Sequence, residues 1–183
     1  GQYSHADGIF FGGERTQWAT RTFLQAVDAH LAGAKQVSYI DLHTGIGPYL
    51  DHIYICFHKA GTASHERARH WWGERAVNRQ GVTHKALADY KGILINALAE
   101  RLPSTEITSV VIEFGTRERR EMQRAGMAGR WLHFEGHRDP AKAARVKADY
   151  AEAFYPSAPE WRKAVLEQSK DFLDKALKGV ASA

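Results

Sequence analysis

Two stretches of this sequence place a chemically active side chain at the end of an apolar strand. The first, SYIDLHTGIGP at residues 38–48, carries His43 after an apolar run, and the glycines and proline that follow predict a turn. The second, VVIEFGT at residues 110–116, carries Glu113 in the strongest strand pattern of the chain. Open α/β sheets bind their ligands at strand ends, so both side chains are candidates for a functional site.

His43 and Glu113 together suit metal-assisted hydrolysis, because that chemistry uses a metal-binding histidine and a general-base carboxylate in one cleft. Glu113 has no oppositely charged neighbour before Arg117, and a carboxylate at the end of an apolar strand is costly unless it is hydrogen-bonded, paired or used. If the two strands are neighbours, both side chains open onto the same edge of the sheet. The residues alone leave a second interpretation open, in which both are structural and unrelated, and Asp41 could equally satisfy a turn amide.

Length and composition describe a globular protein. The chain has 183 residues, enough for one domain with a substantial core, and 44% of them are hydrophobic and 25% charged. No apolar run approaches the roughly 20 residues that a bilayer span requires. The single cysteine, Cys56, excludes an internal disulfide. Together with the lack of a signal-peptide pattern, it leads us to expect a cytoplasmic protein.

The charge of the chain raises the question of a nucleic-acid partner, since the net charge is +4 and the pI about 9.2. Basic and acidic residues are interleaved, however, and the densest basic stretch, residues 117–124, contains two glutamates. Such mixed runs are typical of a solvated helix face. Zinc-finger spacing and an aromatic RNA-binding signature are both absent from the sequence. The charge pattern therefore does not favour nucleic acid.

Helical and strand patterns alternate along the chain. Helices are predicted at residues 16–31, 64–77 and 93–102, after residue 116, from Asp139-Pro140, and after a capping box formed by Ser157 and Glu160. Strands are predicted at residues 37–40, 53–57 and 107–114. Since no repeat or linker interrupts the pattern, we expect an α/β fold in one domain over residues 1–183.

Five motifs together resemble a known family. They are GQYSHADGIFFGG, IDLHTGIGP, VVIEFGT, RWLHFEG and DYAEAFYPSAPEWRKAV, which follow in the family's order from Gly1 to Val165. The chain resembles the C-terminal half of the zinc-carboxypeptidase-like (M14-type) metallopeptidase and deacylase family with domain of unknown function 2817, related to aspartoacylase and succinylglutamate desuccinylase. The resemblance implies a partial carboxypeptidase-like (phosphorylase/hydrolase-like) mixed sheet flanked by helices.

The resemblance also implies roles for His43, Glu113 and Thr44, and the usual surroundings of a metal-ligating histidine suggest one for Asp41. His43 takes the place of a zinc ligand and Glu113 that of the catalytic general base and acid. Thr44 matches a position that lines the substrate cleft beside the zinc, and Asp41 is placed to orient His43. The implied reaction is hydrolysis of an amide bond in a small peptide or an N-acyl amino acid. Glu113 takes the proton of the attacking water and returns it to the leaving amine.

Part of the family's site has no counterpart in this sequence. The family's other two zinc ligands come from a His-x-x-Glu motif upstream of the position of Gly1, and no histidine here is followed by glutamate three residues later. We therefore expect one zinc ligand from this chain and the remaining ligands from a missing N-terminal half, with self-association as another partnership. Two alternatives stay open: a metal-free truncated relative that acts as a binding or assembly module, and a basic nucleic-acid-binding domain.

Overall fold

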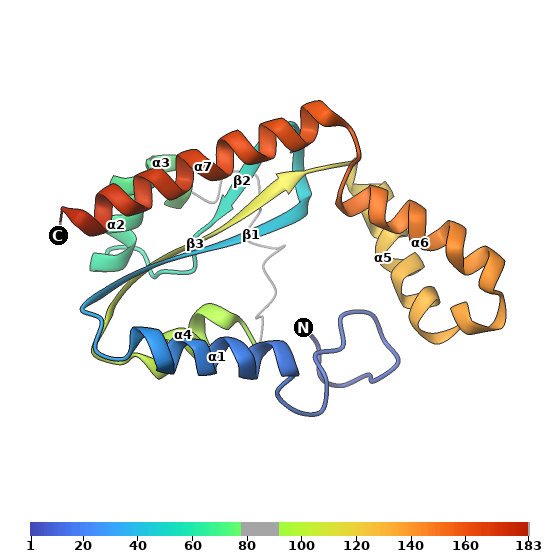
Figure 1. Ribbon diagram of the computed structural model, residues 1–183, viewed down its shortest axis with the longest axis horizontal. Helices are drawn as coiled ribbons and strands as arrows, with labels where there is room; N and C mark the ends of the chain where they lie inside the picture. The colour runs from blue at the N-terminus through green and yellow to red at the C-terminus, as the bar shows by residue number, and fades with distance from the viewer. Residues whose placement is uncertain (78–91, 183) are drawn as a thin grey trace. The chain divides into compact units, whose positions relative to one another are not determined.

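The computed structural model describes residues 1–77 and 92–182. Within them the sheet contains β1 (Gln36–Tyr49), β2 (His52–Ile55) and β3 (Glu106–Gly115), in the order β1-β3-β2 (Figure 1). β2 pairs antiparallel with β3. β1 and β3 start at the same end, where the Glu106 N–H donates to the Lys35 carbonyl, so these two strands are parallel. The sheet is therefore mixed, and the predicted α/β class is confirmed.

Helices follow and precede these strands, as the alternating pattern predicts. They are α1 (Trp18–Leu31), α2 (Ala63–Trp72), α3 (Glu74–Val77), α4 (Leu94–Arg101), α5 (Arg119–Phe134), the 3-10 helix η1 (Gly136–Arg138), α6 (Pro140–Phe154) and α7 (Pro159–Ala181). Asp139 caps α6, because its side chain accepts the Lys142 N–H. Gly73, with φ of +87°, divides the helix predicted at residues 64–77 into α2 and α3. No helix among the described residues has the length and apolar composition to cross a membrane.

Two local predictions are wrong. β1 does not stop before Gly45 but continues to Tyr49, because Gly45 and Gly47 adopt φ of +122° and +117°, angles that other residues rarely take. The capping box also does not form. The Ser157 hydroxyl and backbone N–H donate to the Glu152 carboxylate instead, and α7 begins two residues later, at Pro159.

The strand that carries the predicted histidine lies very close to the strand that carries the predicted carboxylate. A Cβ atom at Gly115 would lie 2.0 Å from the Pro48 carbonyl oxygen, a distance that no side chain tolerates. Gly115 therefore permits the end of β3 to approach the extended end of β1.

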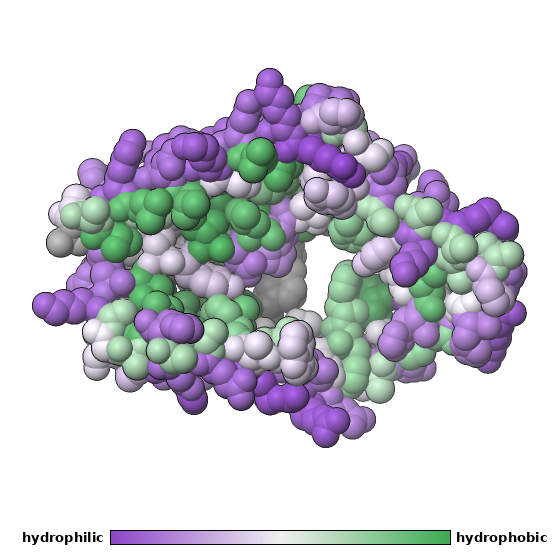
Figure 2. All heavy atoms as spheres, viewed as in Figure 1, coloured by the Kyte–Doolittle hydropathy of each residue, from purple (hydrophilic) through white to green (hydrophobic). Residues whose placement is uncertain are grey.

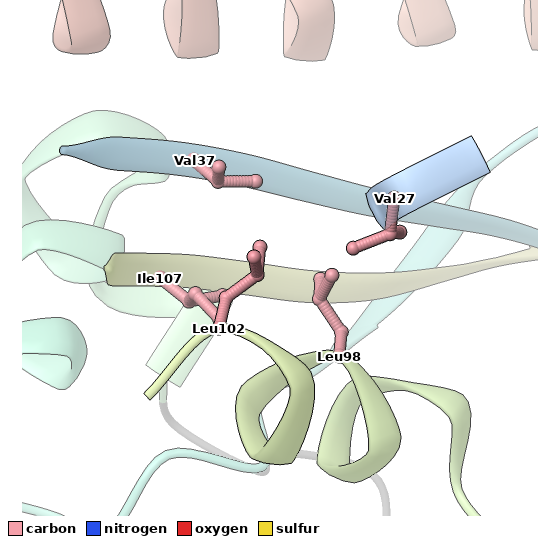
Figure 3. Packing of buried hydrophobic residues seen from close by; sticks show 5 residues of the cluster. All are labelled: Val27, Val37, Leu98, Leu102 and Ile107. Carbon is pink, nitrogen blue, oxygen red and sulfur yellow. The ribbon is translucent and has the colours of Figure 1, made fainter. Parts of the chain in front are cut away.

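The described chain forms two compact units, which share β1 and β3. Among the described residues, unit 1 comprises residues 1–40, 56–77, 92–110 and 175–182, and unit 2 comprises residues 41–55 and 111–174. The core of unit 1 contains Val37 of β1, Ile107 of β3, Val27 of α1, and Leu98 and Leu102 at α4 (Figure 3). Full burial of one such side chain contributes roughly 1.5–3 kcal/mol. The single domain over residues 1–183 stays a prediction.

The core of unit 2 forms where α7 meets the sheet. Trp161 and Phe172 are 1% and 2% exposed, and the Trp161 indole N–H donates to the Gly115 carbonyl at 2.8 Å. Phe172 contacts the rings of His52 and Tyr54 on β2, at centroid distances of 4.9 and 5.2 Å. α7 accordingly shows a hydrophilic side and an apolar side in Figure 2. These contacts fix the strands that carry the candidate site.

Candidate active site

β1 and β3 bring the predicted histidine and carboxylate together within unit 2. His43 Nδ1 lies 3.6 Å from Glu113 Oε1, and His43 Nε2 lies 3.0 Å from Asp41 Oδ1. Asp41 and His43 share one side of β1 because residues two apart in a strand point the same way. The imidazole ring thus stands between two carboxylates, Asp41 on its own strand β1 and Glu113 on the neighbouring strand β3.

The surroundings of Glu113 make its carboxylate bind a proton more readily than a surface glutamate does. Burial raises the pKa of Glu113, and the negative charge of Asp41 raises it further. The His43 charge and the Ile46 backbone N–H act in the opposite direction but do not cancel the effect. The residue is only 7% exposed, and its Oε2 atom has no hydrogen-bond partner among the described residues. A buried carboxyl with unused bonding capacity and a raised pKa is suited to general acid–base chemistry.

His43 is more accessible than Glu113, with 47% of its side chain exposed. The hydrogen bond to Asp41 is the main cause that raises the pKa of His43. Burial lowers this pKa, while the charges of Asp41 and Glu113 raise it. The 3.6 Å separation from Glu113 is too long for a hydrogen bond, so Nδ1 remains available for another partner. Asp41 therefore fixes the ring through Nε2 and leaves Nδ1 facing Glu113.

This arrangement matches one part of a zinc site. A metal-ligating histidine usually has its second ring nitrogen bonded to a carboxylate, as His43 does with Asp41, which leaves Nδ1 as the nitrogen for a metal ion. Catalytic zinc takes three protein ligands, however, and residues 1–77 and 92–182 contain no group of three or more His, Cys, Asp or Glu side chains that could hold a metal ion. The described residues fit one ligand position and do not complete the set.

Thr44, the predicted substrate contact, is not brought to the His43–Glu113 pair. Its hydroxyl donates to the Phe154 carbonyl at 2.6 Å. As the next residue after His43 in β1, it also points to the opposite face of the strand. Thr44 thus ties the end of α6 to β1, and its role in substrate binding stays a prediction.

One contact of the site is not apparent from residue types. The backbone N–H of Ile46 interacts with the Glu113 carboxylate and lowers its pKa. Ile46 lies between Gly45 and Gly47, both with positive φ, so the glycines shape the backbone that presents this N–H. The Gly-Ile-Gly spacing is the sequence signal for it, although by itself it predicts only a turn.

The comparisons with known proteins agree with part of the resemblance. The family model described as a protein of unknown function (DUF2817) matches residues 1–168. Searches of the curated proteins and of the solved structures found no match.

Proposed function

The chain belongs to the DUF2817 family, and we propose that it supplies the acid–base carboxylate and one metal-ligating histidine of a zinc-dependent hydrolase. The bonds cleaved are amide bonds, as in a carboxypeptidase or an N-acyl amino acid deacylase. The observation that supports the proposal most strongly is the buried Glu113, which faces Nδ1 of His43 and whose Oε2 atom has no partner in residues 1–77 and 92–182.

Each residue of the site has a distinct task in this proposal. Glu113 takes a proton from the attacking water and returns it to the leaving amine, and its raised pKa suits both steps at neutral pH. The Ile46 N–H holds the carboxylate in position, and Asp41 sets the orientation of the His43 ring. Zinc, when bound through His43 Nδ1 and further ligands, would acidify the water and polarise the amide carbonyl.

A second candidate function is a metal-free binding or assembly module. One observation favours it, namely that the described part of the chain holds no complete group of metal ligands. The buried carboxyl of Glu113 argues against it, because burial without use costs stability. We therefore rank the hydrolase first.

The test measures zinc content and hydrolysis of N-acyl amino acids and short peptides by the full gene product that contains these 183 residues. Glu113→Gln should lower kcat by about 100-fold or more while zinc is retained, because the amide keeps the shape and removes the proton carrier. His43→Gln should instead lower zinc content. Glu167→Gln on α7 and His137→Gln in η1 are matched controls at exposed positions, and both should behave as the parent protein.

Two results would count against the hydrolase. Full activity in Glu113→Gln would remove the role given to this carboxylate, and full zinc content in His43→Gln would remove the role given to the histidine. A folded product that neither binds zinc nor hydrolyses any substrate would favour the binding module.

A further inference from the structure

Ile46 places an exposed apolar side chain next to the proposed acid–base carboxylate. Its backbone N–H interacts with the Glu113 carboxylate, and the residue is 55% exposed. A backbone hydrogen bond joins nitrogen and oxygen over about 3 Å, and Cβ is two bonds from that nitrogen, so the Ile46 Cβ lies within roughly 6 Å of the carboxylate. Both residues belong to unit 2. Ile46 is therefore close enough to contact the part of a substrate that adjoins the cleaved bond.

The side chains of β1 do not alternate regularly at this point. The Thr44 hydroxyl donates to the Phe154 carbonyl at 2.6 Å, and a Cβ atom at the next residue, Gly45, would lie 3.3 Å from the Phe154 ring. Two successive positions thus face the same residue of α6, whereas successive residues of a regular strand point to opposite faces. The positive φ angles of Gly45 and Gly47 permit this departure. The position of Ile46 consequently follows from its N–H contact and not from the direction of Thr44.

The charges of the site disfavour a charged substrate group beside Ile46. Asp41 and Glu113 are both carboxyl groups, so an acidic group placed next to them would be repelled. A basic group finds no accessible partner in this pair, because Asp41 bonds His43 Nε2 at 3.0 Å and Glu113 is only 7% exposed. An aliphatic group, in contrast, can remove its own apolar surface and that of Ile46 from water. The described residues of the site therefore favour an apolar substrate group.

We propose that Ile46 determines substrate specificity, and that the substrate carries an aliphatic side chain next to the cleaved amide bond, as an N-acyl leucine does. The inference rests on the proposed hydrolase function and names the substrate class of the same site. The side chain of Ile46 contacts the aliphatic group, and its N–H holds the Glu113 carboxylate. One residue thus connects substrate recognition with the position of the acid–base group.

The first experiment compares hydrolysis of N-acetylleucine, N-acetylaspartate, N-acetyllysine and N-acetylglycine by the zinc-loaded full gene product that contains these 183 residues. The parent protein should show a kcat/KM at least about tenfold higher for N-acetylleucine than for the other three substrates. Ile46→Ala should lower this kcat/KM about tenfold, mainly through KM, and should leave the value for N-acetylglycine unchanged, because glycine has no side chain to contact position 46. Ile46→Val should retain most of the parent activity on N-acetylleucine.

Leu166→Ala is the matched control for Ile46→Ala. Leu166 on α7 is 70% exposed and belongs to the same unit, so the substitution removes a similar apolar side chain outside the site. It should leave all four kcat/KM values unchanged. Circular dichroism identifies the folded variants, and Ile46→Val preserves the test if Ile46→Ala does not fold.

A binding measurement separates this inference from the proposed function. In Glu113→Gln protein, N-acetylleucine should bind with a Kd at least about tenfold lower than N-acetylaspartate, and a further Ile46→Ala change should remove the preference. If this preference holds while the parent protein hydrolyses nothing, the proposed function fails and the inference on Ile46 stands. The inference is overturned by a preference for the acidic or the basic compound, by an equal effect of Ile46→Ala on N-acetylglycine, or by no binding of any of the four.

Discussion

The environments of His43 and His58 differ in almost every respect. His43 in unit 2 is half exposed and stands between two carboxylates, and its pKa is raised, chiefly by the hydrogen bond to Asp41. His58 in unit 1 accepts the backbone N–H of the fully buried Ser109, and burial lowers its pKa. The charges of Arg67 and His65 on α2 lower the pKa of His58 further.

The difference separates the proposed site of chemistry from a structural contact. His58 Nε2 is used by two donors of one residue, the Ser109 N–H at 2.8 Å and its hydroxyl at 3.0 Å, so the ring substitutes for a strand. His43 keeps Nδ1 available, and the facing Glu113 keeps Oε2 without a partner among the described residues. Unused bonding capacity is costly in a folded protein, so it points to use by a substrate, an ion or a proton.

The largest effect on stability is expected at His58. His58→Ala should lower the free energy of unfolding by about 2–3 kcal/mol, because the buried Ser109 N–H loses its acceptor and a cavity remains. Urea unfolding at neutral pH measures this change. His137→Ala, at an exposed position in η1, should stay within about 0.5 kcal/mol of the parent protein. Equal stability of the two variants would show that His58 does not hold β3.

In metal-free protein, the contributions of His43 and His58 to the free energy of unfolding should depend on pH in opposite directions. His58 has a lowered folded pKa, so the unfolded chain binds the proton first and stability falls as the pH drops below about 6.5. His43 has a raised folded pKa, so its contribution is present below about 6.5 and disappears as the pH rises through the folded value. Urea unfolding over about pH 5–8 should show the acid-side loss flattened in His58→Gln and the alkaline-side loss flattened in His43→Gln. The same slopes in both variants would contradict this assignment.

The smallest effect concerns Asp41. Asp41→Asn should lower the pKa of His43, because the hydrogen bond and the charge that raise it are weakened. A proton NMR titration of the His43 ring in metal-free protein detects the shift. Asp149→Asn, at an exposed position of α6, serves as the matched control and should leave the titration unchanged. An unaltered His43 pKa in Asp41→Asn would mean that Asp41 does not orient the ring.

Sequence patterns predicted the elements whose signals are local. The β-branched and aromatic residues at positions 107–114 predicted β3, and Asp139-Pro140 predicted the start of α6. The predicted end of β1 was wrong because glycine permits both a turn and an extended backbone. The close approach of Pro48 to Gly115 accompanies the extended form, and the two residues are far apart in the sequence.

The candidate site, like the fold, was predictable from the sequence only in part. The adjacency of His43 and Glu113 followed from two strands with the same pattern, once the strands were taken as neighbours. The role of His58 was not predictable, because its partner Ser109 lies 51 positions away and is an ordinary residue of an apolar strand. A main-chain partner such as the Ile46 N–H leaves only an indirect signal, here the flanking glycines, which by themselves predict no more than a turn.

Urea unfolding of metal-free Glu113→Gln at pH 7 tests most directly whether Glu113 is kept for the proposed chemistry at a cost in stability. The raised folded pKa means that the stability contribution of this carboxyl is present below about 4.5 and is lost as the pH rises through the folded value. Replacement by the neutral amide should therefore raise the free energy of unfolding at pH 7 by about 1 kcal/mol. A decrease of similar size would contradict the claim, because it would identify Glu113 as a structural residue like His58.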